Sequence, residues 1–125
     1  YKKLTLHCED AYDFVLAVSS PPFKGGVGVV GSYAISFFDL FVVDIFVDPI
    51  IPEKFQDEKF LSALNKVLLP DGILFYNFIV RDEKTRDKGA RLYKLMNSLI
   101  GHTEWVRIFS NQTENWVFVS DKMKK

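Results

Sequence analysis

The sequence FDLFVVDIF at residues 38–46 is a nearly continuous apolar run, rich in phenylalanine and β-branched side chains. Such a run is typical of a parallel strand that is buried on both faces of an α/β sheet. Asp44 interrupts the run, and an unpaired carboxylate is costly to bury in an apolar strand. We therefore expect a functional role for Asp44 rather than a purely structural one.

Strand and helix patterns alternate on both sides of this run. Predicted strands are 3–8, 38–46, 73–79, 104–109 and 115–120, and predicted helices begin after Asp10 and cover 53–69 and 82–100. The last two strands are joined by a short polar loop, which predicts a hairpin. The sequence therefore predicts an α/β, Rossmann-like domain with a mostly parallel sheet and a C-terminal antiparallel hairpin.

Composition limits the class of protein. The chain has 125 residues, of which 48% are hydrophobic, and its 16 basic residues balance 16 acidic ones. This length favours one domain over residues 1–125, and the hydrophobic content excludes disorder. Without a basic excess we expect no nucleic-acid partner. The apolar segment 26–47 carries Asp39 and Asp44, which are costly within a bilayer, so we expect no membrane partner and a cytoplasmic protein.

A glycine-rich segment at residues 26–31, GVGVVG, matches the dinucleotide-binding pattern G-x-G-x-x-G. That pattern binds a pyrophosphate when it follows a strand and opens a helix. Here the segment follows a helix and Pro21-Pro22, and it leads toward a strand. We therefore interpret residues 19–36 as an inserted loop and not as a cofactor site.

Short polar side chains lie at or just past the carboxyl ends of three of the predicted strands. They are Asp10, Asp44, Asp48 and Asn77. Ligands of open α/β sheets bind outside the carboxyl ends of the strands, so these side chains are expected to converge on one edge. The structural alternatives are helix capping by Asp10, loop capping by Asp48 and a solvated turn at Asn77.

Other reactive residues give weaker signals. His7 and His102 have no partners at metal-ligand spacing, and we predict no metal site. Cys8 cannot form an intrachain disulfide and is interpreted as a small core residue. Trp116 alternates with valines in the last strand, so core packing is its default interpretation.

Taken in order, these residues resemble the later half of a spermidine synthase-type aminopropyltransferase, a branch of the class I S-adenosylmethionine-dependent methyltransferase fold. Asp10-Ala11 with Phe14 is similar to one motif of that family, and the run ending in Asp44 is similar to its catalytic strand. The similarity continues through Leu68-Leu69-Pro70-Asp71-Gly72-Ile73-Leu74, Asn77 and Trp116-Val117-Phe118 with Ser120 and Lys122.

The resemblance implies a role for each of the candidate site residues. Asp44 would be catalytic, Asp10 and Ala11 would contact the adenine of the cofactor, and Asp48, Asn77 and Trp116 would bind the substrate. The cofactor would be S-adenosylmethionine or its decarboxylated form, and the partner a small-molecule amine of polyamine type. Methyl transfer to another acceptor, or a non-catalytic domain that serves as a packing surface, are the alternatives.

The chain departs from the family in two respects. Asp44 and Asp48-Pro49 are one residue further apart than the family's aspartates. The family's glycine-rich cofactor loop and its ribose-binding acid precede everything matched here, so we expect a partial domain that lacks the N-terminal cofactor-loop strands. Strand 38–46 would then be a sheet edge. Either the sequence is a truncated fragment of a longer protein, or the first strand moves in beside 38–46, or another chain, such as a second copy in a homo-oligomer, covers the edge.

Overall fold

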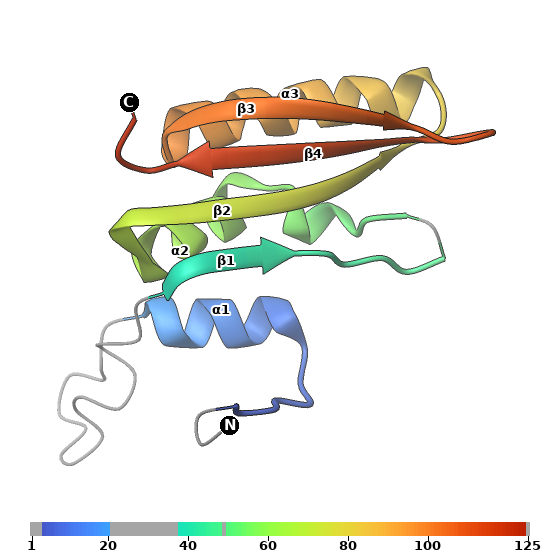
Figure 1. The fold of residues 1–125 in the computed structure, drawn as a ribbon. Helices are drawn as coiled ribbons and strands as arrows, with labels where there is room; N and C mark the ends of the chain where they lie inside the picture. The colour runs from blue at the N-terminus through green and yellow to red at the C-terminus, as the bar shows by residue number, and fades with distance from the viewer. Residues whose placement is uncertain (1–3, 21–37, 49, 125) are drawn as a thin grey trace, which may run out of the picture.

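The strands form one mixed sheet in the order β1-β2-β4-β3 (Figure 1). The computed structural model describes residues 4–20, 38–48 and 50–124. Its elements are α1 (Ala11–Ser19), β1 (Phe38–Val43), the 3₁₀ helix η1 (Glu53–Phe55), α2 (Glu58–Val67), β2 (Leu68–Val80), α3 (Glu83–Leu99), β3 (His102–Phe109) and β4 (Glu114–Asp121). The predicted inserted loop lies outside the described residues except for Ser19 and Ser20.

One of the three strand pairings is parallel, that of β1 with β2, whereas β4 pairs with β2 and β3 in antiparallel fashion. The α/β class and the C-terminal hairpin are therefore confirmed, and the sheet is mixed. The register shifts between the pairs Phe38–Leu68 and Leu40–Ile73. The predicted turn at residues 70–72 lies in this irregular start of β2, which makes β2 longer than the sequence predicted.

The predicted strand at residues 3–8 is absent from the described residues, because residues 4–10 have no regular structure and are exposed. A strand exists only when a neighbour accepts its backbone hydrogen bonds, and β1 pairs with β2 alone among the described strands. Cys8 is consequently exposed, which corrects its interpretation as a core residue.

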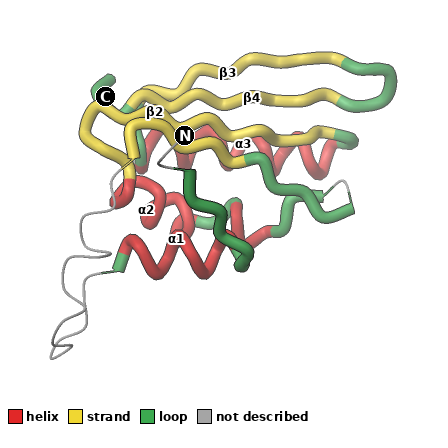
Figure 2. The backbone as a smooth tube through the Cα atoms, turned by 60° about the horizontal axis from the view of Figure 1, so that its bottom comes forward, coloured by secondary structure: helices red, strands yellow, loops and turns green. Residues whose placement is uncertain are grey.

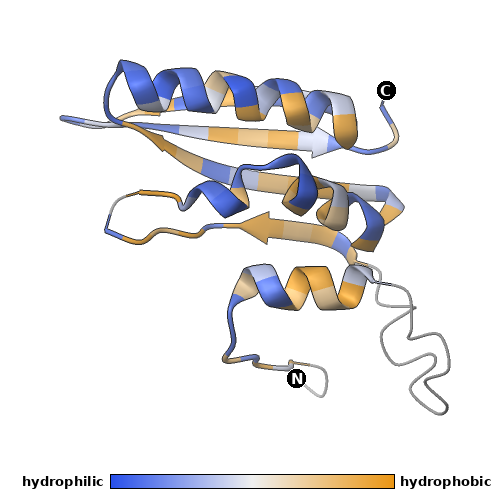
Figure 3. Cartoon of the chain, turned by 180° about the vertical axis from the view of Figure 1, so that it is seen from behind, coloured by the Kyte–Doolittle hydropathy of each residue, from blue (hydrophilic) through white to orange (hydrophobic). Residues whose placement is uncertain are grey.

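The helices lie on one side of the sheet, as Figure 2 shows. The core between these layers includes Val15 of α1, Leu64 of α2, Met96 of α3 and Phe118 of β4. Leu40 and Val42, on the opposite face of β1, are 54% and 60% exposed. Figure 3 shows that β1 is apolar along most of its length. The prediction that this strand is buried on both faces is therefore wrong for the described residues, and β1 is an edge strand.

Capping residues set the starts of the helices. The Asp82 side chain accepts from the Thr85 N–H at 2.8 Å, and the Thr85 hydroxyl oxygen accepts from the Asp82 N–H, a capping box that begins α3. The Asp57 side chain caps α2 by accepting from the Phe60 N–H at 2.8 Å, so this helix begins after the 3₁₀ turn and not at Glu53 as predicted. Gly101 follows α3 as predicted, and a Cβ there would lie 2.2 Å from the Asp121 carbonyl oxygen.

Candidate functional site

Three polar side chains form a hydrogen-bonded chain across the carboxyl ends of β1 and β2. Asn77 donates from Nδ2 to Asp44 Oδ1 at 3.1 Å, and Asn115 donates from Nδ2 to Asn77 Oδ1 at 3.3 Å. The predicted convergence is therefore correct for Asp44 and Asn77. We call Asp44, Asn77 and Asn115 the edge triad.

Strand periodicity places two members of the edge triad on the face of the sheet that the helices leave bare. Tyr76 and Phe78 point into the core from β2, so Asn77 between them points the other way. Trp116 is buried on β4, which puts Asn115 on the same bare face as Asn77. The triad is thus held by two neighbouring strands and opens toward solvent.

Asp44 is exposed because it follows the last residue of β1. The expectation of a carboxylate buried within an apolar strand is wrong, since the strand is shorter than predicted. Its Oδ1 is held by Asn77. In the described part of the chain no donor contacts its Oδ2, so this oxygen is available to a ligand.

Asp48 lies in a tight turn after β1. The backbones of Val47 and Ile50 exchange hydrogen bonds of 2.8 and 3.0 Å, and the turn between them gives Asp48 a φ of 44°. Aspartate tolerates this left-handed conformation better than most residues. Asp48 is exposed, and no hydrogen bond joins it to the edge triad among the described residues. Its substrate-binding role stays a prediction.

Asp10 caps α1, as the structural alternative predicted, with Oδ1 accepting from the N–H groups of Tyr12 and Asp13 at 2.8 and 3.2 Å. Its Oδ2 forms an ion pair with Lys54 of η1 at 2.7 Å. The hydrogen bond from Lys54, followed by that from the Asp13 N–H, lowers the pKa of Asp10. Ala11 is the exposed first residue of α1. Figure 1 shows that this end of α1 lies on the same side of the molecule as the carboxyl end of β1.

Trp116 is not part of this arrangement. It is 1% exposed and lies on the helix side of the sheet, opposite the face that carries Asn77. Its indole Nε1 donates to Glu114 Oε2 at 2.6 Å. The core-packing interpretation therefore fits Trp116, and the substrate-binding role implied by the resemblance does not fit its position.

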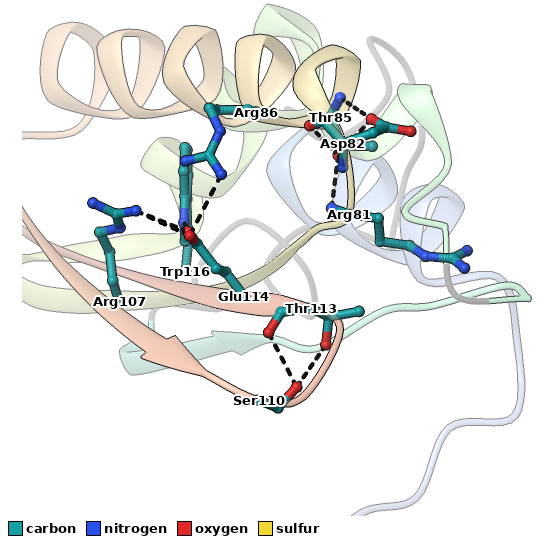
Figure 4. Close-up of polar contacts among 9 residues, drawn as sticks. All are labelled: Arg81, Asp82, Thr85, Arg86, Arg107, Ser110, Thr113, Glu114 and Trp116. Atoms are coloured by element: carbon teal, nitrogen blue, oxygen red, sulfur yellow. Dashed lines mark hydrogen bonds and ion pairs between the residues drawn. The ribbon is translucent and has the colours of Figure 1, made fainter.

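Glu114 is the centre of a second polar cluster, at the start of β4 (Figure 4). It accepts from Trp116 Nε1 and from Arg107 Nη2 at 3.0 and 3.2 Å, and Arg86 Nη2 lies 3.4 Å from its Oε1. The Trp116 hydrogen bond, then that from Arg107, lowers the pKa of Glu114 below its ordinary value of 4.5.

This lowered pKa leads to an expected pH dependence of stability. A carboxyl whose pKa is lower in the folded state contributes stability above its unfolded pKa, and loses it as the pH falls through the folded pKa. The stability difference between wild type and Glu114→Gln should therefore be largest near neutral pH and shrink below about pH 4. Urea unfolding at several pH values measures it. Glu104→Gln, at an exposed glutamate of the same hairpin, is the control, and an equal pH trend in both variants would contradict the assignment.

Asn115 is the residue that the sequence interpretation missed. It shares its face of β4 with Val117 and Val119, so it is a polar residue beside two apolar ones. That break in the pattern is a usable signal. Asn115 reaches the site only because β4 lies beside β2. Local periodicity does not predict this long-range pairing.

Within 4–20, 38–48 and 50–124, no group of three or more histidine, cysteine, aspartate or glutamate side chains could hold a metal ion. No helix in the described part of the chain is long and apolar enough to cross a membrane. The glycine-rich segment 26–31 lies outside the described residues, and none of the described glycines lies in a strand-to-helix turn.

Neither a protein-family model nor a curated protein matches the sequence. Solved structures do match the fold. Human methyltransferase-like protein 13 in complex with SAH gives a TM-score of 0.65 at 20% identity, over 90% of this chain and 47% of that chain. A probable spermidine synthase from Corynebacterium glutamicum gives 0.58 at 19% identity, over 72% and 33% of the two chains.

A third structure, the CMeT domain of the citrinin polyketide synthase, gives a TM-score of 0.50 at 13% identity, over 86% of this chain and 31% of that chain. The chain therefore spans about half the length of the first of these structures and a third of the other two. At these identities the likeness concerns the fold alone, and the chain matches part of the class I methyltransferase fold.

Proposed function

We propose that this chain is the acceptor-binding part of a transferase of methyltransferase fold, which moves an aminopropyl group from decarboxylated S-adenosylmethionine to an amine. The observation that carries the proposal is the edge triad, where Asp44 is exposed at the carboxyl end of a parallel strand and held by Asn77 at 3.1 Å. Ligands of open α/β sheets bind at this end of the strands.

The edge triad suits a protonated amine. The Asn77 amide orients the Asp44 carboxylate, and the Asn115 amide in turn orients Asn77. Asp44 Oδ2 then accepts a hydrogen bond from the ammonium group and attracts its charge. An aliphatic amine has a pKa near 10, so it is a nucleophile only after it has lost a proton. Asp44 is the base to which this proton passes.

The cofactor supplies a carbon bound to a positively charged sulfur. When bound, the cofactor would let the amine nitrogen bond to that carbon as the carbon–sulfur bond breaks and its electron pair stays on sulfur, while Asp44 would hold the amine in place. The proton of the amine leaves through Asp44 to solvent. Atoms and charge balance without a metal or redox partner. The contribution of this chain is to bind the acceptor and hold its proton at Asp44 Oδ2.

The residues present fit one end of the cofactor. The Asp10 side chain is exposed at the start of α1, and its Oδ2 accepts a hydrogen bond from Lys54. The same oxygen can accept from an exocyclic amino group such as that of adenine, and the neighbouring Ala11 carries only a methyl group. The described residues include no site for the ribose, and the proposal assigns none.

Isothermal titration calorimetry of the 125-residue chain tests the proposal. Decarboxylated S-adenosylmethionine, S-adenosylmethionine and methylthioadenosine are titrated in turn. We expect saturable binding of at least one of them, weakened by Asp10→Asn and not by Asp13→Asn, which alters the neighbouring exposed carboxylate of α1. Absence of binding by all three ligands, to a chain with cooperative thermal unfolding, would contradict the proposal.

The same experiment separates the alternatives. Binding of S-adenosylmethionine in preference to its decarboxylated form would favour methyl transfer, with an acceptor other than a polyamine. No binding would favour a non-catalytic domain, for which the exposed edge of β1, with Leu40 and Val42, offers a packing surface. In that case pairing of β1 with a second copy is the corresponding proposal, and light scattering measures it.

A further inference from the structure

One face of the sheet is left bare by the described helices. Figure 1 is seen from this side, with α2 and α3 behind the strands. The strand registers bring six apolar side chains together on this face, namely Leu40 and Val42 of β1, Phe75 of β2, Val117 and Val119 of β4, and Val106 of β3. We call these six residues the bare patch.

Cross-strand partners connect the bare patch across all four strands. Val42 pairs with Phe75, Phe75 pairs with Val119, and Val117 pairs with Val106. Paired residues lie opposite one another on the same face of a sheet, and Val117 and Val119 share a face because they are two residues apart in β4. The bare patch is therefore contiguous from one edge of the sheet to the other.

The bare patch is exposed in the single chain. Val42 is 60% exposed, Val106 is 50% exposed and Phe75 is 37% exposed. The described N-terminal segment does not pack on it, because Leu4 and Leu6 are themselves exposed. Contiguous apolar surface of this kind is uncommon on monomeric proteins and marks an interaction site.

The sequence of β4 is apolar on both of its faces. Trp116 and Phe118 point into the core, whereas Val117 and Val119 belong to the bare patch. A strand with one face in water normally alternates apolar and polar residues, and strands that are apolar throughout are typical of sheets covered on both faces. The pattern of β4 therefore indicates that the bare patch packs against another surface.

The size and shape of the bare face suit a second sheet. Four strands about 4.8 Å apart and about eight residues long make a face of roughly 19 by 26 Å, or about 500 Å². Two such faces in contact bury roughly 1,000 Å², the size that a specific protein interface should reach. Small molecules bind in concave cavities, whereas two sheets pack face to face with interdigitated side chains.

The charges on this face also favour an apolar contact. Glu104 and Asp121 share the face with the valines of β3 and β4, and no lysine or arginine of these two strands lies on it. A polyanionic partner such as a nucleic acid therefore finds no cations there. A second copy of the chain presents the same flat apolar surface, which is what a twofold-symmetric interface requires.

We propose that two copies of this chain associate through the bare patch, as a twofold-symmetric dimer of sheets packed face to face. The contact closes at two chains because each copy uses the same surface. Asn77 pairs with Val117, and Asp44 follows the last residue of β1, so the edge triad borders the contact. The area is near the lower limit for a specific interface, so the dimer is in equilibrium with single chains. The inference does not depend on the proposed function.

Sedimentation equilibrium of the 125-residue chain, from low to high micromolar concentration, tests the proposal. We expect the average mass to rise from one chain toward two. Val42→Lys and Val106→Lys lie at opposite edges of the sheet, and each should weaken association at least about ten-fold, because a lysine would be buried in an apolar contact. Both positions are exposed in the single chain, so the variants should fold, which thermal unfolding measures.

Phe109→Lys is the matched control. Phe109 is an exposed apolar residue of β3 on the opposite face from Val106, so its replacement should leave association unchanged. Equal weakening by Phe109→Lys and Val106→Lys would assign the contact to the edge of β3 and overturn the proposal. Weakening by Val42→Lys alone would assign it to the edge of β1, with the same consequence.

The mass itself can also overturn the proposal. A mass of one chain at every concentration would show that the bare patch does not bind a second copy. A mass that continues to rise beyond two chains would show that the contact does not close. Because no S-adenosyl ligand is used, failure of this proposal is distinguishable from failure of the transferase proposal.

Discussion

Asp44→Asn is expected to reduce the rate of aminopropyl transfer by about 10²- to 10⁴-fold, the range typical of losing a positioned general base. Asparagine keeps the size of the side chain and its carbonyl can still accept from Asn77, so the edge triad keeps its shape. It cannot take a proton from the amine. The rate is measured as release of methylthioadenosine from decarboxylated S-adenosylmethionine in the presence of a diamine.

Two further variants make this expectation specific. Asp39→Asn alters another exposed aspartate of β1 and should leave the rate unchanged. Asn77→Ala removes the donor that orients Asp44, and an intermediate loss of rate is expected because the carboxylate itself remains. Equal rates for wild type and Asp44→Asn would show that Asp44 is not the base.

Trp116→Ala is expected to destabilise the fold by about 3–5 kcal/mol, the range measured for large aromatic side chains in cores. Trp116 is 1% exposed and packs against Trp105, with ring centroids 4.2 Å apart. Its loss also removes the indole N–H that Glu114 accepts at 2.6 Å. Gly89 of α3 faces the same ring, since a Cβ there would lie 2.7 Å from Trp116. Urea unfolding measures the change.

Trp105→Ala is the matched control for this substitution. Trp105 belongs to the same aromatic cluster and is 39% exposed, so its removal should cost clearly less stability. If Trp116 bound substrate at the surface instead, Trp116→Ala would weaken acceptor binding with little change in unfolding free energy. That result would restore the role implied by the family resemblance and contradict the buried position.

Much of the fold could be predicted because local signals for it are strong. The capping residue Asp82, the amphipathic pattern of α3 and the polar loop before β4 are all local in sequence, and the structure contains each of these elements. The antiparallel hairpin likewise joins neighbouring segments. The formation of these elements depends little on contacts with residues that are distant in the sequence.

The errors arose where structure depends on distant partners. The alternation at residues 3–8 satisfies the strand pattern, yet no described strand pairs with it. The apolar run after Phe38 predicted burial on both faces, but Leu40 and Val42 are exposed at a sheet edge. The sequence pattern of a strand predicts which side chains share a face. It does not predict whether another part of the protein packs against that face.

The candidate site, like the fold, could be predicted only in part from the sequence. Asp44 and Asn77 could be predicted to meet, because the carboxyl ends of parallel strands share one edge. Asn115 joins them only through the pairing of β4 with β2, which local sequence does not encode. Trp116 is buried on the opposite face of β4 from Asn115, since adjacent residues of a strand point to opposite faces, and its substrate-binding role stays a prediction of the resemblance.

Side-chain amide NMR of Asn77 during titration with a short aliphatic diamine tests the central claim most directly. The Asn77 amide donates to Asp44 Oδ1, so an ammonium group bound at Oδ2 must change its environment. We expect saturable shifts of the Asn77 side-chain signals in wild type, and at least about ten-fold weaker binding in Asp44→Asn. Unshifted Asn77 signals at saturating diamine, with the chain folded, would contradict a cation-binding site at the edge triad.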